Sequence, residues 1–280
     1  MRKNYKFHRY IFPITLLVCA GIIPFTTFSQ KKNPPGTILL RKDLYIDETP
    51  VCNIEYRDYK YVLSKFLRFN LDKFEDYTNS MPDLKFETSS FFKQIDFKPN
   101  NDSLKYLIPE TDEMIFGDWI DYKSYLTLPA FNYFPVVNVN SEIAKSYCRW
   151  RTSMVKVLYA SESKAKERKY LHDNFEYRLA TYEELKLATE KFKSEKKLKI
   201  QAAGKSDSLP SFRHLEKGKN LQKFVITNLF ELVKEEDGIY ETNWDPKKQI
   251  ILPNLLIDNN FIRENLTFRC VCEIKENISN

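Results

Sequence analysis

Residues 134–139 read FPVVNV, residues 141–158 read SEIAKSYCRWRTSMVKVL, and residues 177–185 read YRLATYEEL. The β-branched residues behind Pro135 predict a short buried strand over 136–139. The second segment has apolar residues at three- and four-residue steps, which predicts a helix at about 141–158, begun by Asn140 or Ser141. Thr181 and Glu184 have capping-box spacing and predict a second helix at about 182–193. The stretch therefore alternates strand and helix.

The neighbouring segments extend this pattern over the rest of the chain. Residues 37–40 and 44–47 predict a hairpin, and Asn53 is placed to cap a helix that follows it. Residues 70–130 and 201–220 are rich in turn signals and predict loops and short helices. The basic run at 186–199 predicts a solvated helix face. Together these features predict one α+β domain with long loops over residues 30–280.

Residues 1–29 have the features of an export signal. Arg2, Lys3, Lys6 and Arg9 precede an apolar stretch at 11–25, and small residues at 27 and 29 predict cleavage before Gln30. The apolar stretch is short for a membrane-spanning helix, with an uncleaved anchor as the alternative. We therefore expect an exported protein of the periplasm or cell envelope, with no membrane span after cleavage.

Removal of this signal changes the charge balance of the chain. Four of the 44 Lys and Arg residues leave with it and no acidic residue does, so 40 basic residues face 38 acidic ones. A chain so close to neutral gives no reason to expect nucleic acid as a partner. About 250 residues suffice for one domain with a sizeable core.

The same stretch resembles the formylglycine-generating-enzyme (sulfatase-modifying factor) domain family. Members read approximately P-V-x-x-V-S-W-x-x-A-x-x-Y-C-x-W, followed by R-L-P-T-E-x-E-W-E. The matching residues are Pro135, Val136, Val139, Ala144, Tyr147, Cys148, Trp150, Arg178, Leu179, Thr181 and Glu184. Asn228, Glu231, Trp244 and the FRCV segment containing Arg269 match later motifs, although Thr227 and Thr267 stand where the family has glycine. Residues 126–132 and 148–152 are similar to the branch of gliding-motility and secretion-system lipoproteins.

This resemblance implies a C-type-lectin-like fold with its terminal strands side by side. It also implies a disulfide between Cys148 and Cys270. Cys52 and Cys272 would then remain, and adjacent terminal strands would allow them to form a second bridge. Cys19 leaves with the signal, and the remaining four cysteines allow three pairings, so the sequence alone leaves this second bridge open.

The catalytic chemistry of the family is missing from this sequence. Formylglycine-generating enzymes use two cysteines that bind copper, a metal that soft thiolates select. In the family these cysteines lie between the G-G-S-W and F-R-C strands, and the corresponding interval from Asp245 to Phe268 contains none. After removal of the signal only His172 and His214 remain, too few for the three-histidine iron site of another branch.

Calcium is the one cofactor that the resemblance leaves open. Glu231 matches an acidic ligand position of the family, but calcium requires six or more oxygens and the neighbouring positions do not match. A buried structural carboxylate is therefore the interpretation we favour for Glu231.

We therefore expect an exported, non-catalytic family member that binds or scaffolds an envelope protein or a glycan. The losses of glycine at 227 and 267 indicate a remodelled cleft. A divergent thiol oxidase that uses Cys52 or Cys272 is the alternative. A lectin-type module, suggested by fold analogy and by the many aromatic residues, is a third hypothesis.

Overall fold

The computed structural model describes residues 31–68, 112–116, 120–161, 165–201, 223–235, 238–245, 247–257 and 265–276. The expected signal peptide and most of the predicted loops at 70–130 and 201–220 lie outside these residues. Helices and strands are mixed along the described chain, as expected for an α+β protein. Within the described residues, no helix is both long and apolar enough to cross a membrane.

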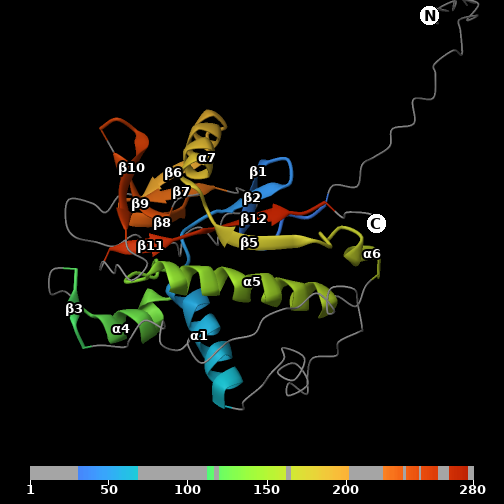
Figure 1. The fold of residues 1–280 in the computed structure, drawn as a ribbon, viewed down its shortest axis with the longest axis horizontal. Coiled ribbons are helices and arrows are strands. Elements are labelled where there is room, and N and C mark those ends of the chain that lie inside the picture. The colour runs from blue at the N-terminus through green and yellow to red at the C-terminus, as the bar shows by residue number, and fades with distance from the viewer. Residues whose placement is uncertain are drawn as a thin grey trace, which may run out of the picture. The chain divides into compact units, whose positions relative to one another are not determined.

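The first sheet brings the two ends of the described chain together. Its strand order is β1 (Thr37–Arg41), β2 (Leu44–Asp47), β12 (Cys270–Ile274) and β5 (Phe175–Leu179), as Figure 1 shows. The predicted hairpin is confirmed, and its turn places Asp43 at a φ of 59°. Val271 of β12 lies opposite Ile46 on one side and Arg178 on the other. The last strand is therefore a neighbour of the N-terminal hairpin, but it pairs with β2 and not, as predicted, with the first strand, β1.

A helix packs against each face of this sheet. The helix α5 (Ser141–Ser161) lies along β5 in Figure 1, and its residues Tyr147 and Cys148 share a core cluster with Cys270 and Cys272. The intervening Val271 points to the opposite face, where it packs with the helix α7 (Tyr182–Ser194). Side chains alternate between the two faces of a strand, so β12 must be apolar at successive positions. This explains the continuous run CVC at 270–272.

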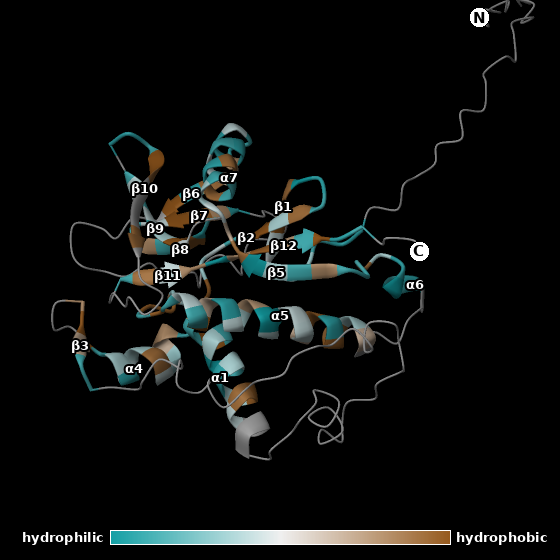
Figure 2. Cartoon of the chain, in the orientation of Figure 1, coloured by the Kyte–Doolittle hydropathy of each residue, from teal (hydrophilic) through white to brown (hydrophobic). Residues whose placement is uncertain are grey.

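A second four-stranded sheet adjoins the first through the chain itself. Its order is β10 (Ile250–Ile257), β9 (Ile239–Asp245), β8 (Phe230–Lys234) and β11 (Leu266–Phe268), and β11 is parallel to β8. Only Arg269 separates β11 from β12, so one extended segment contributes to both sheets. A parallel pair, β6 (Leu198–Gln201) and β7 (Phe224–Thr227), lies beside α7. In Figure 2 β7 is hydrophobic.

The remaining elements are shorter or lie at the edge of the core. They are α1 (Asn53–Arg68), β3 (Met114–Ile115), β4 (Ile120–Asp121), α4 (Tyr122–Thr127), the 3-10 helix η2 (Pro129–Phe131) and α6 (Ala165–Arg168). The helix α6 is mostly hydrophilic in Figure 2, since Lys166, Glu167 and Arg168 follow its first residue. Tyr59 of α1 packs against Tyr147 and Trp150 of α5, with ring centroids 5.7 and 5.5 Å apart, and thereby joins the two helices.

The two central helices agree closely with the sequence prediction. Asn140 Oδ1 accepts from the Ile143 N–H at 2.9 Å and begins α5. The capping box at α7 is present in both directions: Thr181 Oγ1 accepts from the Glu184 N–H, and Glu184 Oε2 accepts from the Thr181 N–H. Local side-chain chemistry fixes both helix starts, which is why the sequence sufficed to place them.

Two local predictions were wrong, and a third holds only in part. Residues 136–139 form no regular strand: Cys52 and Pro135 make an isolated bridge, and Asn138 has a φ of 63°, which ends the extended backbone. The Asn53 side chain does not cap α1: its Oδ1 accepts from no group in the described residues, and its Nδ2 donates to the carbonyls of Tyr125 and Phe131 at 3.1 Å each. The basic run at 186–199 forms a solvated helix face as far as Ser194, but beyond it Lys196 has a φ of 57° and β6 follows.

The positions of the cysteines are compatible with one of the two disulfides considered above and not with the other. The Sγ atoms of Cys148 and Cys270 lie 2.9 Å apart, in the pairing that the resemblance implies. Cys52 lies near residue 268, because the Val51 N–H donates to the Phe268 carbonyl at 2.9 Å. Cys272 lies four residues beyond residue 268 along the extended chain, a distance on the order of 10 Å. Bridged cysteines need Cα atoms within about 7 Å, so this fold does not support a bridge between Cys52 and Cys272.

We predict that the exported chain contains a Cys148–Cys270 disulfide and two thiols, those of Cys52 and Cys272, that are not disulfide-bonded and react slowly. Cys52 is 7% exposed and Cys272 is fully buried, which limits access by reagents. Alkylation in denaturant without reductant should modify Cys52 and Cys272 alone, and peptide mapping should recover 148 linked to 270. A peptide linking 52 to 272, or reaction of all four cysteines without reductant, would contradict this arrangement.

Candidate functional site

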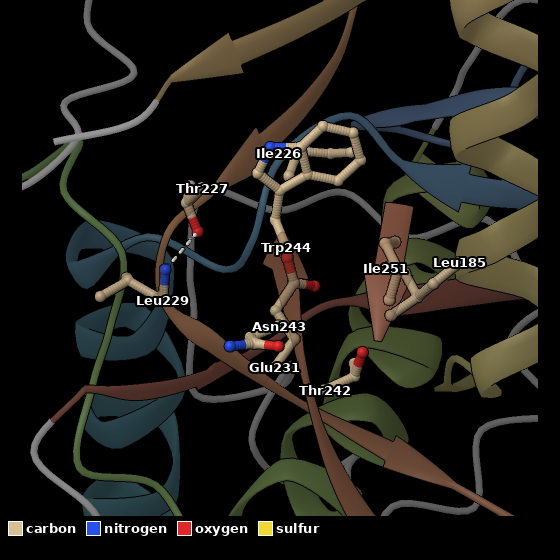
Figure 3. Close-up of a pocket in the computed structure, with 9 residues that line it drawn as sticks. All are labelled: Leu185, Ile226, Thr227, Leu229, Glu231, Thr242, Asn243, Trp244 and Ile251. Carbon is tan, nitrogen blue, oxygen red and sulfur yellow. Dashed lines mark hydrogen bonds between the residues drawn. The ribbon is translucent and has the colours of Figure 1, made fainter. Parts of the chain in front are cut away.

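A small cavity lies where α7 meets β7, β8, β9 and β10, and Figure 3 shows the side chains around it. Its apolar wall includes Leu185 and Ile251, and its polar wall includes Glu231, Thr242 and Asn243. It is partly open to solvent and has room for about 10 Å³, which is close to the smallest space that can hold one water molecule. The segments around it include those that match the family motifs at Asn228, Glu231 and Trp244.

Two buried polar atoms at this cavity have no hydrogen-bond partner in the described part of the chain. They are the indole Nε1 of Trp244, a donor, and the Oδ1 of Asn243, an acceptor. Trp244 is only 6% exposed. Buried polar atoms are almost always paired, with ordered water as a frequent partner. The cavity is therefore suited to one water molecule or one small polar group, and it is too small for a larger ligand in this conformation.

The neighbouring hydroxyls are already paired within the protein. Thr227 Oγ1 accepts from the Leu229 N–H at 3.3 Å, and Thr242 Oγ1 donates to the Leu252 carbonyl at 2.7 Å. The Thr227 side chain lines the cavity (Figure 3). This threonine therefore narrows the cavity and adds a local hydrogen bond.

Glu231 forms a buried bidentate ion pair with Arg269. Its Oε2 and Oε1 accept from Arg269 Nε and Nη2, both at 2.6 Å, and Arg269 is 1% exposed. Arg269 also donates to the carbonyls of Val225 at 2.9 Å and Asp47 at 3.3 Å, and its guanidinium lies 4.5 Å from the centroid of the Phe224 ring. These contacts satisfy a charge that would otherwise be costly to bury.

This pairing bears on the calcium site that the resemblance implies. Both carboxylate oxygens of Glu231 are bonded to Arg269, so a calcium ion would have to displace a guanidinium. No group of three or more His, Cys, Asp or Glu side chains arranged to hold a metal occurs within the described ranges. The residues present do not fit calcium, and the geometry agrees with a structural carboxylate.

A second buried ion pair lies between α5 and the first sheet. Asp47 Oδ2 accepts from Arg151 Nη1 at 2.7 Å and from the Cys270 N–H at 2.8 Å. The Arg151 guanidinium lies 4.5 Å from the centroid of the Tyr177 ring. Burial raises the pKa of Asp47, and Arg151 opposes that effect. Arg151 therefore holds α5 against β2 and the start of β12.

The other residues of the family motif have structural contacts. Arg178 donates to Glu184 at 2.9 and 2.7 Å and to Glu273 at 3.0 Å, which links β5 to α7 and β12. Although burial raises the pKa of Glu184, its hydrogen bonds to Arg178 and Thr181 lower that pKa overall. Tyr147 packs on Phe268 with centroids 5.3 Å apart, and Trp150 is buried beside it. Asn228 is exposed.

The remaining thiols and the described histidine are buried among apolar and aromatic side chains. Cys52 belongs to a small cluster with Val225, and burial raises the pKa of Cys272. Reactive cysteines need a lowered pKa and solvent access, and Cys272 has neither. His172 Nε2 lies 3.2 Å from the Tyr45 hydroxyl, and burial lowers its pKa. His214 lies outside the described residues.

The sequence prediction did not include several residues of these sites. Asp47 and Arg151 lie within quoted motifs, but their pairing depends on how α5 packs on β2. Asn243 has no distinguishing sequence signal beyond its place beside Trp244. In contrast, Glu231 and Arg269 belong to matched motifs, and the fold brings them together. Comparisons with protein-family models, with curated proteins and with solved structures found no match to this chain.

We predict that Glu231→Gln lowers the free energy of unfolding by about 3–5 kcal/mol, because it leaves Arg269 buried without a countercharge. Urea denaturation followed by circular dichroism would measure this. The matched control is Glu183→Gln, whose partner Lys186 is 3.5 Å away in a pair that is largely exposed, and it should cost less than about 1 kcal/mol. Equal losses of unfolding free energy in the two variants would show that the burial of Arg269 does not depend on the charge of Glu231.

The titration of Glu48 should make the stability of the protein depend on pH. Burial, and then the charge of Asp47, raise its pKa from 4.5 to about 7. A carboxyl group whose pKa rises on folding favours the folded state when protonated, so its contribution is complete below about 4.5 and is lost as the pH rises through about 7. The melting temperature should therefore fall between about pH 5 and about pH 8, and Glu48→Gln should reduce that slope. An unchanged slope in Glu48→Gln, with Glu183→Gln as control, would exclude Glu48 as a source.

Proposed function

We propose that this chain has the C-type-lectin-like fold of the formylglycine-generating-enzyme family and acts as an exported binding or scaffold protein of the cell envelope. In this proposal its partner is an envelope protein or a glycan, and it catalyses no thiol oxidation. The observation that carries the proposal is the lack of cysteine from Asp245 to Phe268, where the family has its copper-binding pair.

The contacts between motif residues support the fold assignment. Strand β2 of the N-terminal hairpin pairs with the last strand, β12, Cys148 lies against Cys270, and Tyr147 packs on Phe268. Arg178 pairs with Glu184, and Glu231 pairs with Arg269. Each of these pairs joins segments that the resemblance had identified separately, so the motif residues hold one framework together.

The state of the thiols supports a role without catalysis. A thiol oxidase needs a thiolate that can reach its substrate. Cys270 and Cys272 are fully buried, Cys148 is 2% exposed, and Cys52 is 7% exposed. The cavity at Trp244 has room for about one water molecule, so it offers no space for a substrate peptide.

An oxidase assay tests this proposal against a divergent thiol oxidase. The purified full chain would be incubated with Cu(I), oxygen and a cysteine-containing peptide, with a formylglycine-generating enzyme as the positive control. We expect no oxygen consumption and no change in peptide mass. Oxidation that Cys52→Ser or Cys272→Ser abolishes, with the fold retained by circular dichroism, would overturn the proposal and establish the oxidase.

A further inference from the structure

The C-terminal end of α7 meets two turns of the chain, and the three segments form one surface. Lys193 Nζ donates to Gln249 Oε1 of the turn between β9 and β10 at 2.9 Å. Lys191 Nζ donates to the carbonyls of Leu39 and Leu40 at 2.9 Å each, just before the turn between β1 and β2. The helix end therefore lies between the two turns, as Figure 1 shows.

Exposed cations gather on this surface, which we call the basic end. It consists of residues 41–43, 193–197 and 245–249, and its seven basic side chains are all exposed: Arg41, Lys42, Lys193, Lys196, Lys197, Lys247 and Lys248. Three acidic residues belong to the same segments, namely Asp43, Glu195 and Asp245. The preceding pair in α7, Glu190 and Lys191, leaves this excess of four unchanged. Since the exported chain as a whole is nearly neutral, the positive charge is a local property of this end.

Two of the acidic residues are engaged within the basic end. Asp245 Oδ1 accepts from the N–H groups of Lys247 and Lys248 at 2.8 and 3.1 Å, which orders the turn between β9 and β10. Glu195 pairs with Lys197 at 2.8 Å. Within the described residues, no ion pair is formed by the ammonium groups of Lys193, Lys196, Lys247 and Lys248. Four exposed cations therefore have no countercharge in the protein.

Exposed aliphatic side chains adjoin these cations. Ile250 follows the turn between β9 and β10 and is 46% exposed, and Leu39, two residues before Arg41, is 37% exposed. Leu187 of α7 is also 37% exposed, and it lies one turn before Lys191 on the same face of the helix. Aliphatic side chains beside lysines are typical of protein surfaces that lie on anionic membranes.

A lipid surface fits these features better than a glycan or an acidic protein does. A sugar would need an exposed aromatic face, and Tyr61 of α1 is the only exposed aromatic side chain among the described residues. Six of the seven cations are lysines, compact point charges that suit diffuse attraction to headgroups, whereas arginine suits bidentate recognition of carboxylates. The cations also come from two turns and a helix end on the same side of Figure 1, so one flat surface can meet them together.

We propose that the basic end binds the anionic headgroups of a lipid membrane, as a peripheral contact. The four lysines without a countercharge attract headgroup phosphates, and Ile250 and Leu39 contact the boundary of the acyl region. This contact holds the protein at a lipid surface and leaves its other faces for a partner. It involves neither the Trp244 cavity nor any cysteine, so it does not depend on whether the protein catalyses a reaction.

Sedimentation with lipid vesicles tests this proposal, using the protein purified after export. The test vesicles contain phosphatidylcholine and phosphatidylglycerol in equal parts, and the control vesicles contain phosphatidylcholine alone. We expect stronger binding to the anionic vesicles, weakened by raising the salt from about 50 to about 300 mM. Equal binding to the two kinds of vesicle, or no binding to the anionic ones, would overturn the proposal.

Charge reversals identify the surface that binds. The two test variants are Lys193→Glu/Lys196→Glu and Lys247→Glu/Lys248→Glu, and each should weaken binding to anionic vesicles about tenfold or more. The control Lys123→Glu/Lys166→Glu makes the same charge change at exposed residues of α4 and α6, which lie apart from the basic end in Figure 1. It should change affinity less than about twofold. All variants share one N-terminus, so a retained signal cannot separate them, and equal affinities of test and control variants would contradict the proposal.

A further variant should strengthen binding and so does not depend on a loss of folding. Ile250→Trp introduces an indole, which favours the membrane interface, so affinity for the anionic vesicles should rise about threefold or more. Leu128→Trp is the matched control, because Leu128 is 47% exposed and lies outside the basic end, and it should leave affinity unchanged. An unchanged affinity in Ile250→Trp would exclude a lipid surface. Binding of a soluble anionic polysaccharide or a glutamate-rich peptide without binding of the vesicles would exclude it too.

Discussion

The burial of Arg269 is the constraint on which the rest of the structure depends. Its guanidinium is 1% exposed and bonds to Glu231 of β8, to the Val225 carbonyl of β7 and to the Asp47 carbonyl of β2. Burying one cation costs several kcal/mol, so all of these acceptors must be in place together. Arg269 is also the single residue between β11 and β12, which belong to different sheets. One side chain therefore fixes the two sheets relative to each other.

A second buried ion pair, between Asp47 and Arg151, positions the helix α5 relative to the same junction of the sheets. Asp47 accepts from Arg151 of α5 and from the N–H of Cys270, the residue that follows Arg269. The carboxylate therefore positions α5 relative to the same junction, and it brings Cys148 against Cys270. Since Val271 then faces α7, the alternation of side chains on β12 determines which helix covers which face. The two buried pairs and one short strand thus organise a helix, sheet and helix arrangement.

The sequence predicted those elements whose geometry depends on neighbouring residues. The starts of α5 and α7 follow from Asn140 and from the Thr181–Glu184 capping box, and the hairpin follows from its turn. Pairings that depend on strand register were less predictable: Cys52 and Cys272 are kept apart because residue 51 pairs with residue 268. The unpaired Nε1 of Trp244 arises only when distant segments pack, so no local pattern indicates it.

The cavity at Trp244 and the contact between α5 and β5 are both shaped by side chains. At the cavity, Thr227, Trp244, Leu185 and Ile251 fill the surrounding space and leave about 10 Å³. Between α5 and β5, Thr152 Oγ1 accepts from the Tyr177 N–H at 2.8 Å, which joins the helix to the edge strand. The exposed side chains of Arg149 and Glu176 line an open groove of about 260 Å³ beside this contact. Filling the cavity therefore stabilises the junction between the sheets, whereas the α5–β5 surface keeps charged side chains in solvent.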